Sequence, residues 1–373
     1  MDNRNLTLLE KEFLYAVTLN GLAPLAGERT LQSLYYIFRG RKANQTLQDV
    51  HLYSLHPYYR MFPRISREAW EENIAFLLSD GLVRLTKGTG GSPKPSFALT
   101  EQGVAEQQAG RERFRLDYWF TPFSSPTQPE QVSLFWQRLH LMIQTVSQLL
   151  ANDTGFQPVV QNRQVQQWVK RTLASVEQRL LWQDHLYNEL FSLLSALPLN
   201  VQELIVRQLS GASQVGSTVT QLALSAGQSP SFIQLQVRFG LAVIVRRLEK
   251  EKDAFPLLST LIEPTGGKDL RLSESASQTY ELVRQHCTLD EIARRRNIKS
   301  STVEDHLVEI ALHCPEWDCV EYVSEKEQEE IIRVSERLGT SRLRLLKDSL
   351  GPQYSYLKIR LALALRKGRE HGA

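Results

Sequence analysis

The sequence predicts a mainly α-helical protein in three parts: an N-terminal winged helix-turn-helix with a small β-wing, a helical middle domain, and a C-terminal helix-turn-helix domain. Apolar residues recur at helical spacing along most of the chain. Two short segments of β-type sequence flank a glycine-rich stretch near residue 90. Proline- and glycine-rich punctuation near residues 121–130 and 263–269 divides the chain into the predicted domains 1–125, 126–268 and 269–373.

The first block contains three predicted helices, over residues 28–40, 44–55 and 66–81. Gly40 marks the end of the first helix, and Asn44 is a suitable N-cap for the second. The third helix has Trp70, Ile74 and Leu77 at spacings that place them on one face. Two predicted strands follow, over residues 82–86 and 95–100, with a glycine-rich turn between them over residues 87–94. Residues 98–103 lead from the second strand into a further helix. This order of elements is typical of a winged helix-turn-helix.

The middle block opens with a long predicted helix over residues 131–150, and another apolar stripe begins at Val165 and continues through Leu180. Residues 218–237 fit a second helix-turn-helix template. Thr218 and Gln221 form a capping box, Gly227 supplies the turn, and Pro230 stands at the first position of the next helix. The helix that follows, 232–248, is apolar on nearly every side, so it is expected in a core or at an interface.

The third block contains further predicted helices over residues 275–286, 324–340, 342–350 and 355–369. Its clearest motif is LDEIARRRNIKSSTVEDHLVEIA, residues 289–311. Thr288 and Glu291 form a capping box, Ala293 allows two helices to cross closely, and Asn297 occupies the turn position that requires a positive φ. The side chains predicted to point inward are Ile298, Val303, Leu307 and Ile310. The motif therefore predicts helix-turn-helix geometry.

The outer face of the second helix in this motif is acidic where a DNA reader is usually basic. The predicted outward residues are Thr302, Asp305, His306 and Glu309. Carboxylates beside phosphates are repelled, so this face is poorly suited to reading bases and better suited to docking on a protein. Phe232 and Phe239, on the apolar helix of the middle block, are further candidates for partner docking.

Several basic residues lie where loops, the wing or the end of a helix would present them to phosphates. The candidates for nucleic-acid contact are Arg39, Arg41, Lys42, Arg64, Lys87, Lys94, Arg294, Arg295 and Arg296. Solvated loops, and pairing of the three consecutive arginines with nearby acids, are the alternatives.

Charge is balanced over the whole chain but uneven within the third block. The net charge is +3, so no strong basic field indicates nucleic acid. Residues 301–330 carry ten acids against Lys326, and residues 331–373 carry ten bases against three acids. Helix faces that attract each other within one domain explain this pattern; the alternative is a basic C-terminal face that meets a phosphate backbone.

No enzyme signature is complete in the sequence, and no cofactor, metal or small-molecule substrate is expected. The glycine-rich stretches lack the full spacing of phosphate- or dinucleotide-binding loops. Cys287, Cys314 and Cys319 are interpreted as reduced thiols, since no second ligand pair completes a metal site. The chain opens without a signal pattern and lacks a long uncharged apolar run, so a cytoplasmic protein without membrane association is expected.

Residues 275–311 and the stretch LGPQYSYLKIRLALAL resemble the helicase helix-turn-helix domain, which occurs at the C-terminus of some RecQ-type DNA helicases and in stand-alone bacterial proteins. ERTLQSLYYIFRGRKANQTLQDVHLYSL and TVTQLALSAGQSPSFIQLQ resemble the stand-alone group, the YpbB-like proteins. Asn297 departs from the glycine usual in that family, and Lys299 from its common capping serine. The resemblance implies a non-catalytic accessory protein of a RecQ-type helicase, acting in DNA repair or recombination.

Three functions remain open from the sequence. The first is this helicase accessory factor, docked on the motor protein and adding weak, sequence-independent DNA contacts. The second is a helix-turn-helix transcriptional regulator that binds duplexes selectively. The third is an interaction scaffold that does not bind nucleic acid.

Overall fold

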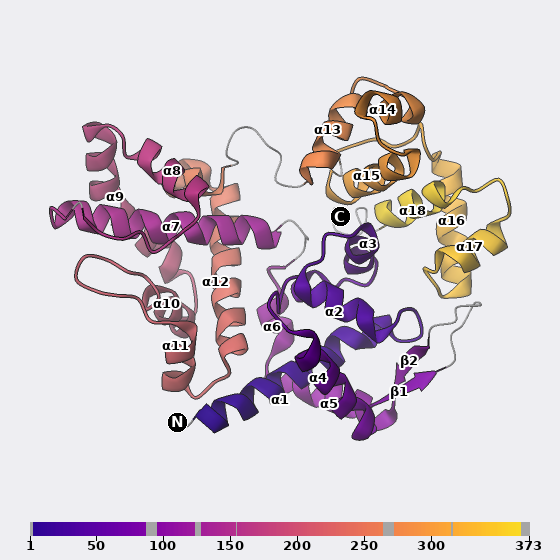
Figure 1. Ribbon diagram of the computed structural model, residues 1–373, viewed down its shortest axis with the longest axis horizontal. Coiled ribbons are helices and arrows are strands. Elements are labelled where there is room, and N and C mark those ends of the chain that lie inside the picture. Colours follow the sequence, from indigo (N-terminus) through magenta and orange to yellow (C-terminus); the bar gives the residue numbers. More distant parts are fainter. Residues whose placement is uncertain are drawn as a thin grey trace. The chain divides into compact units, whose positions relative to one another are not determined.

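The computed structural model describes residues 3–86, 95–123, 128–153, 155–263, 272–314 and 316–366. This part of the chain is mainly helical, as predicted (Figure 1). The chain divides into two compact units. The first comprises Met1–Leu14, Arg115–Phe123 and Gln128–Gly267, and the second comprises Tyr15–Phe114, Ser124–Thr127 and Lys268–Ala373. The predicted boundaries of three domains stay a prediction.

The first unit is helical and is built around α12 (Pro230–Lys250). Its other helices are the start of α1 (Asn3–Leu22), α6 (Leu116–Phe120), α7 (Gln128–Leu150), α8 (Arg163–Thr172), α9 (Val176–Ser195), α10 (Leu199–Val206), α11 (Val219–Ala226), η3 (Lys252–Ala254) and η4 (Leu258–Ile262). Helix α12 packs against α6, α7, α9, α10, α11 and η4. The expectation that this apolar helix is buried is therefore confirmed.

Local signals in this unit define the helix ends. The capping box of Thr218 and Gln221, the left-handed turn at Gly227 (φ 65°) and Pro230 at the start of α12 all occur as predicted. The apolar stripe after Val165 forms two helices, because the hydroxyl of Ser175 accepts a hydrogen bond from the backbone of Gln178 and begins α9 there. Helices α1 and α10 were not predicted.

The N-terminal part of the second unit holds the small β-sheet. Its elements are the rest of α1, then η1 (Ala23–Leu25), α2 (Leu31–Arg39), α3 (Asn44–Leu52), η2 (His56–Tyr58), α4 (Arg67–Ser79), β1 (Val83–Thr86), β2 (Ser96–Leu99) and α5 (Glu101–Arg113). The two strands are antiparallel, with Val83 opposite Leu99. Ala43 is the N-cap of α3, so the prediction of Asn44 as its cap is wrong by one residue. Residues 53–66, which include η2, separate α3 from α4.

The C-terminal part of the second unit is a bundle of helices: α13 (Glu274–Val283), α14 (Leu289–Arg296), α15 (Ser300–His313), α16 (Glu325–Leu338), α17 (Leu343–Leu350) and α18 (Tyr356–Leu365). Helix α15 packs against α13, α14 and α18, and α16 packs against α17 and α18. Ile292, Leu307, Ile331 and Leu361 are fully buried between these helices. Within the described residues, no helix is long and apolar enough to cross a membrane.

Candidate nucleic-acid interface

The turn between α14 and α15 has the local geometry that the sequence predicts. The hydroxyl and backbone N–H of Thr288 donate to the Glu291 carboxylate at 2.9 and 2.8 Å, and the backbone N–H of Glu291 donates to the Thr288 hydroxyl. Asn297 ends α14 in the left-handed conformation (φ 51°), and Ala293 is buried at the helix crossing. Val303, Leu307 and Ile310 are fully buried, as predicted, and Ile298 is half-buried.

The outer face of α15 differs from the prediction. His306 and Glu309 were expected to point outward, but both are buried, so the prediction of their orientation is wrong. Thr302 and Asp305 are half-buried. The physical reason is that helices distant in the sequence cover this face: α13 and α18 from the same bundle, and α3 from the N-terminal part of the unit. Helical periodicity predicts which residues share a face of α15, but not how many of its faces are covered by other helices.

Glu309 fixes the start of α13. Its carboxylate accepts hydrogen bonds from the backbone N–H of Ser273 at 2.5 Å and from the Ser273 hydroxyl at 3.0 Å. Ser273 is the N-cap of α13 and accepts in turn from the backbone of Ala276. Burial raises the pKa of Glu309, while the bonds from Ser273 and the charge of Lys42 act in the opposite direction. The carboxylate is thus committed to holding α13 in place.

Arg296 of α14 and His306 of α15 also contact α13. The Arg296 guanidinium donates to the backbone carbonyl of Ser275 at 2.7 Å, to Oε1 of Gln278 at 2.9 Å and to the hydroxyl of Thr279. Thr279 also lies 2.8 Å from Nδ1 of His306. Burial and the charge of Arg296 lower the pKa of His306. Because Arg296 joins α14 to α13, its predicted role as a phosphate contact does not fit its geometry.

The acidic and basic stretches of the third block meet in ion pairs within the bundle. Asp305 pairs with Arg360 at 2.7 Å, Glu327 with Lys358 at 2.6 Å, and Glu336 with Arg366 at 3.1 Å. The bond from Lys358, with those from Ser324, lowers the pKa of Glu327 to about 2. These pairs support the interpretation that the uneven charge reflects helix faces attracting each other within one domain.

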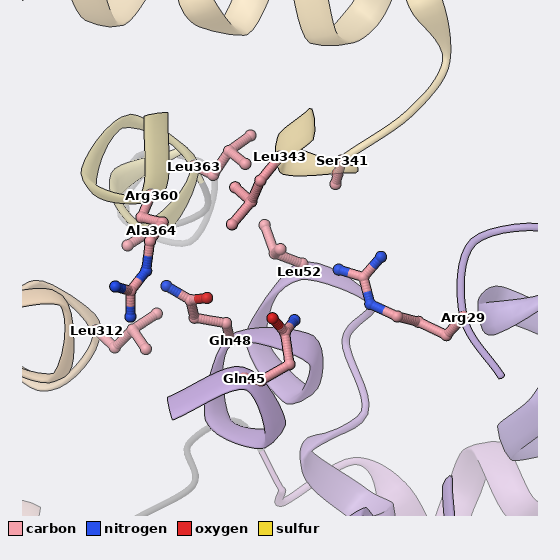
Figure 2. A pocket seen from close by; sticks show the side chains of 10 residues that line it. All are labelled: Arg29, Gln45, Gln48, Leu52, Leu312, Ser341, Leu343, Arg360, Leu363 and Ala364. Atoms are coloured by element: carbon pink, nitrogen blue, oxygen red, sulfur yellow. The ribbon is translucent and has the colours of Figure 1, made fainter. Parts of the chain in front are cut away.

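Helix α3 lies against α15 and α18. Figure 2 shows a pocket at this seam, where Gln45, Gln48 and Leu52 of α3 face Leu312 and Leu363 of the bundle. With a volume of about 10 Å³, the pocket has no room for a ligand larger than a water molecule. The seam is therefore a packed interface and not a substrate site.

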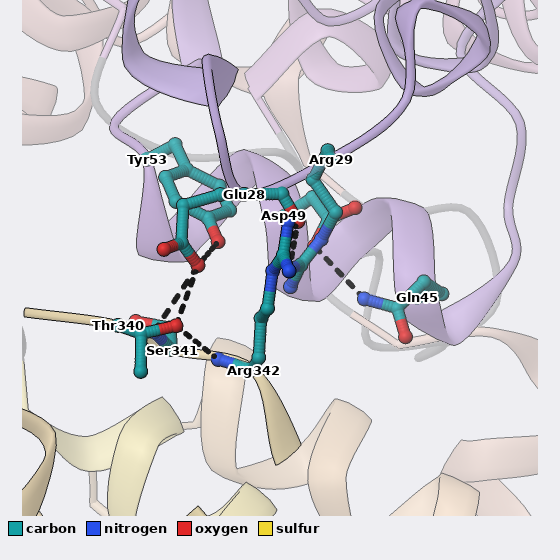
Figure 3. Close-up of polar contacts among 8 residues, drawn as sticks. All are labelled: Glu28, Arg29, Gln45, Asp49, Tyr53, Thr340, Ser341 and Arg342. Carbon is teal, nitrogen blue, oxygen red and sulfur yellow. Dashed lines mark hydrogen bonds and ion pairs between the residues drawn. The ribbon is translucent and has the colours of Figure 1, made fainter. Parts of the chain in front are cut away.

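Polar contacts also join the N-terminal and C-terminal parts of the second unit, between Glu28 and residues 340–342 (Figure 3). The Glu28 carboxylate accepts from the hydroxyl of Tyr53 at 3.2 Å, the hydroxyl of Thr340 at 3.0 Å and the backbone N–H of Ser341 at 3.4 Å. Arg342 donates to the backbone carbonyl of Glu28 at 3.2 Å. These contacts, together with the packing of α3, hold the outer face of α15 inside the unit.

A group of exposed polar residues remains at the α14–α15 turn, and it consists of Arg294, Arg295, Asn297, Lys299, Ser300 and Ser301. Arg294 and Arg295 occupy the last turn of α14, and Lys299 is the N-cap residue of α15. We call these six residues the turn tip. The structure thus brings two of the three predicted arginines to one exposed corner and takes the third, Arg296, into the bundle.

The remaining predicted basic residues belong to the N-terminal part. Arg39, Arg41, Lys42 and Arg64 are exposed. Lys87 and Lys94 lie outside the described residues. Arg60, which precedes the third predicted helix together with Arg64, was not among the candidate contacts and is half-buried; residues 29–67 carry seven bases against Asp49 alone.

The two phenylalanines predicted to dock a partner pack inside the first unit instead. Phe239 is buried, with ring centroids 5.1 Å from both Tyr118 and Trp119 of α6. Phe232 lies 5.4 Å from Phe13 and is half-buried. Their prediction as surface docking residues is wrong, because α6 and α1 cover this side of α12.

The described residues contain no group of three or more histidine, cysteine or acidic side chains placed to hold a metal ion. Cys287, Cys314 and Cys319 are buried free thiols, and burial raises the pKa of Cys319 to about 11. The thiol of Cys319 is therefore protonated at neutral pH.

Comparison with known proteins bears on the C-terminal bundle and on the whole chain. Residues 275–363 match the model of a family described as Helix-turn-helix domain. The helix-turn-helix assignment is confirmed. The chain is similar to Protein YpbB of Bacillus subtilis (strain 168), with 26% identity over 351 residues that cover 93% of this chain and 96% of that protein. No solved structure matches the chain significantly.

Proposed function

We propose that this protein is a non-catalytic accessory factor of a RecQ-type DNA helicase that contacts the DNA backbone without reading its sequence. The C-terminal helix-turn-helix domain, a fold that proteins widely use to bind DNA, supports the DNA-binding part. The helicase link rests on the resemblance of the chain to YpbB-like proteins.

One observation carries the mode of binding: the bases of the turn tip are exposed, while on the outer face of α15 His306 and Glu309 are buried, Thr302 is half-buried and Asp305 is ion-paired. Arginine and lysine at a helix-turn-helix corner bind phosphate oxygens, and backbone contacts of this kind carry no sequence information. A helix whose middle is covered by α3 and α18 presents few side chains to base edges.

We propose the N-terminal part as a winged helix-turn-helix variant. The order of α2, α3, α4, β1 and β2 and the antiparallel strands support this assignment. The segment 53–66 takes the place of the three- or four-residue turn that joins the two helices of an ordinary helix-turn-helix.

Fluorescence anisotropy with labelled duplexes tests the DNA contact. We expect weak binding that falls steeply with salt, and Arg294→Gln/Arg295→Gln reduces it about tenfold per lost contact near 0.1 M salt. Lys170→Gln/Arg171→Gln is the matched control, since these exposed bases also lie in the last turn of a helix, α8. Equal affinity of the two double variants contradicts the role of the turn tip.

Two further measurements test the rest of the proposal. Selection from random duplexes is expected to return no motif; a defined motif favours a transcriptional regulator instead. Co-purification with the RecQ-type helicase of the same genome tests the accessory role, and the absence of a complex at micromolar concentration contradicts it.

A further inference from the structure

A second cluster of bases lies in the N-terminal part of the second unit, on two stretches of chain. From Arg29 to Arg67 the sequence has seven bases and one acid, Asp49, a local charge of +6. Asp49 is buried and pairs with Arg29 at 2.8 Å, and Arg67 pairs with Glu71 at 2.7 Å. The other bases of this stretch are Arg39, Arg41, Lys42, Arg60 and Arg64. We call these five residues the α2–α3 basic cluster.

The fold brings the two stretches of this cluster together through backbone contacts. The N–H of Arg60 donates to the carbonyl of Ile37 at 3.0 Å, and the N–H of Phe62 donates to the carbonyl of Phe38 at 3.1 Å. The Tyr59 hydroxyl donates to the carbonyl of Gly40 at 3.2 Å. The loop that carries Arg60 and Arg64 therefore runs beside the end of α2.

Gly40 makes this close approach sterically allowed. Its φ of 68° belongs to the left-handed region, and a Cβ at this position would lie 1.9 Å from Cγ of Arg60. Arg60 also has a positive φ, 58°. The chain thus adopts one unfavourable backbone conformation where the bases meet, at Arg60, and this conformation needs support from the surrounding fold.

Two of the guanidinium groups rest on tyrosine rings. Arg41 lies over Tyr36 at 4.6 Å from the ring centroid, and Arg39 lies over Tyr35 at 5.8 Å and donates to its hydroxyl at 3.1 Å. Stacking on a ring restricts the side chain and leaves N–H groups at the guanidinium edge for an anion. Binding of a ligand then costs less side-chain entropy of the arginines, because their conformations are already restricted, as is typical of prearranged phosphate sites.

The surroundings of the cluster favour nucleic acid over an acidic protein. Protein interfaces are anchored by exposed aromatic or aliphatic side chains, but no large hydrophobic side chain between residues 29 and 67 is exposed, and the structure describes all of them. Phosphate contact requires only charge and hydrogen-bond donors.

We propose that the α2–α3 basic cluster is a second binding site for the phosphate backbone of nucleic acid, separate from the turn tip. This inference rests on the proposed function, because it takes nucleic acid as the ligand. Two backbone sites on one compact unit increase the number of phosphates neutralised, so the salt dependence of binding is steeper than the turn tip alone produces.

The test is a salt titration of the full-length chain with a labelled duplex. Arg41→Gln/Arg64→Gln removes one base from each stretch and keeps the packing of Gly40 on Arg60. We expect the slope of log affinity against log salt to become shallower by about 2, since each phosphate contact contributes about 0.9. Lys170→Gln/Arg171→Gln again serves as the control, with the slope of the unmodified chain expected.

The outcomes separate the two proposals. An unchanged slope in Arg41→Gln/Arg64→Gln, with a reduced slope in Arg294→Gln/Arg295→Gln, overturns the second site and leaves the proposed function intact. The reverse result supports the second site and contradicts the turn tip, and no binding by the unmodified chain overturns both. If polyglutamate of matched charge displaces the duplex as well as unlabelled DNA does, the cluster is an acidic-peptide site and the inference is overturned.

Discussion

Arg294, Arg295 and Arg296 are consecutive in the sequence, and the structure gives the third a different role. Arg296→Ala removes a side chain that joins α14 to α13 through Ser275, Gln278 and Thr279. A hydrogen bond from a charged donor contributes about 1.5–3 kcal/mol when water is excluded. The guanidinium is partly exposed, so we assign about 1 kcal/mol to the part-buried bond to Thr279 and about 1 kcal/mol in total to the exposed bonds to Ser275 and Gln278. The expected loss is about 2 kcal/mol.

Hydrogen exchange measured by mass spectrometry locates this loss. A decrease of about 2 kcal/mol in local stability accelerates exchange of the α13 and α14 amides about 30-fold. Arg294→Ala and Arg295→Ala are the matched controls, because exposed substitutions change stability by about 0.5 kcal/mol or less. Arg296→Lys restores only part of the protection, since an ammonium lacks the planar fork. Equal exchange in Arg296→Ala and Arg295→Ala would refute the structural role of Arg296.

Three further predictions follow from single positions. Gly40→Ala is expected to destabilise the protein by about 1–3 kcal/mol more than Gly27→Ala in urea unfolding: both glycines have positive φ, but an added Cβ collides with Arg60 only at Gly40. Burial and Arg296 lower the pKa of His306 from its usual 6.5, so the unfolded chain binds its proton more readily. Stability therefore falls as pH drops below about 6.5, and urea midpoints of His306→Gln are expected to depend less on pH there. Asn297→Gly relieves a φ of 51° and is expected to stabilise the turn by about 0.5–1 kcal/mol; a lower urea midpoint contradicts this.

Local signals were predictable from the sequence because neighbouring residues determine them. The capping boxes begun by Thr218 and Thr288 occur as predicted, and Gly40, Gly227 and Asn297 end their helices in the left-handed conformation. The break at Ser175 was missed because the apolar stripe continues across it. Helix α10 was missed because its N-cap position is Pro198, which offers no capping side chain.

The candidate site was predictable only in part, since its accessibility depends on contacts between distant residues. Burial of Glu309 depends on Ser273 and the covering helices, and the ion pair of Asp305 depends on Arg360. No spacing within residues 289–311 contains this information. The exposed Arg294 and the half-buried Arg296 are likewise indistinguishable in a run of three arginines, and only the position of α13 separates them.

The packing of α15 limits the ways in which the domain can approach DNA, the ligand that we propose for it. A major groove about 12 Å wide admits one helix of about 10–12 Å diameter, so the part of a helix that enters the groove must not be covered by other helices. Helix α15 is solvent-exposed at Ser300 and Ser301, while Asp305 forms an ion pair with Arg360 and Glu309 is buried. Only its first turn is therefore able to approach base edges, and two serine hydroxyls discriminate poorly between bases because each both donates and accepts. As long as α3 and α18 stay in place, the proposed DNA contact is expected to draw its binding energy from phosphates rather than bases, and its affinity is expected to vary with salt far more than with sequence.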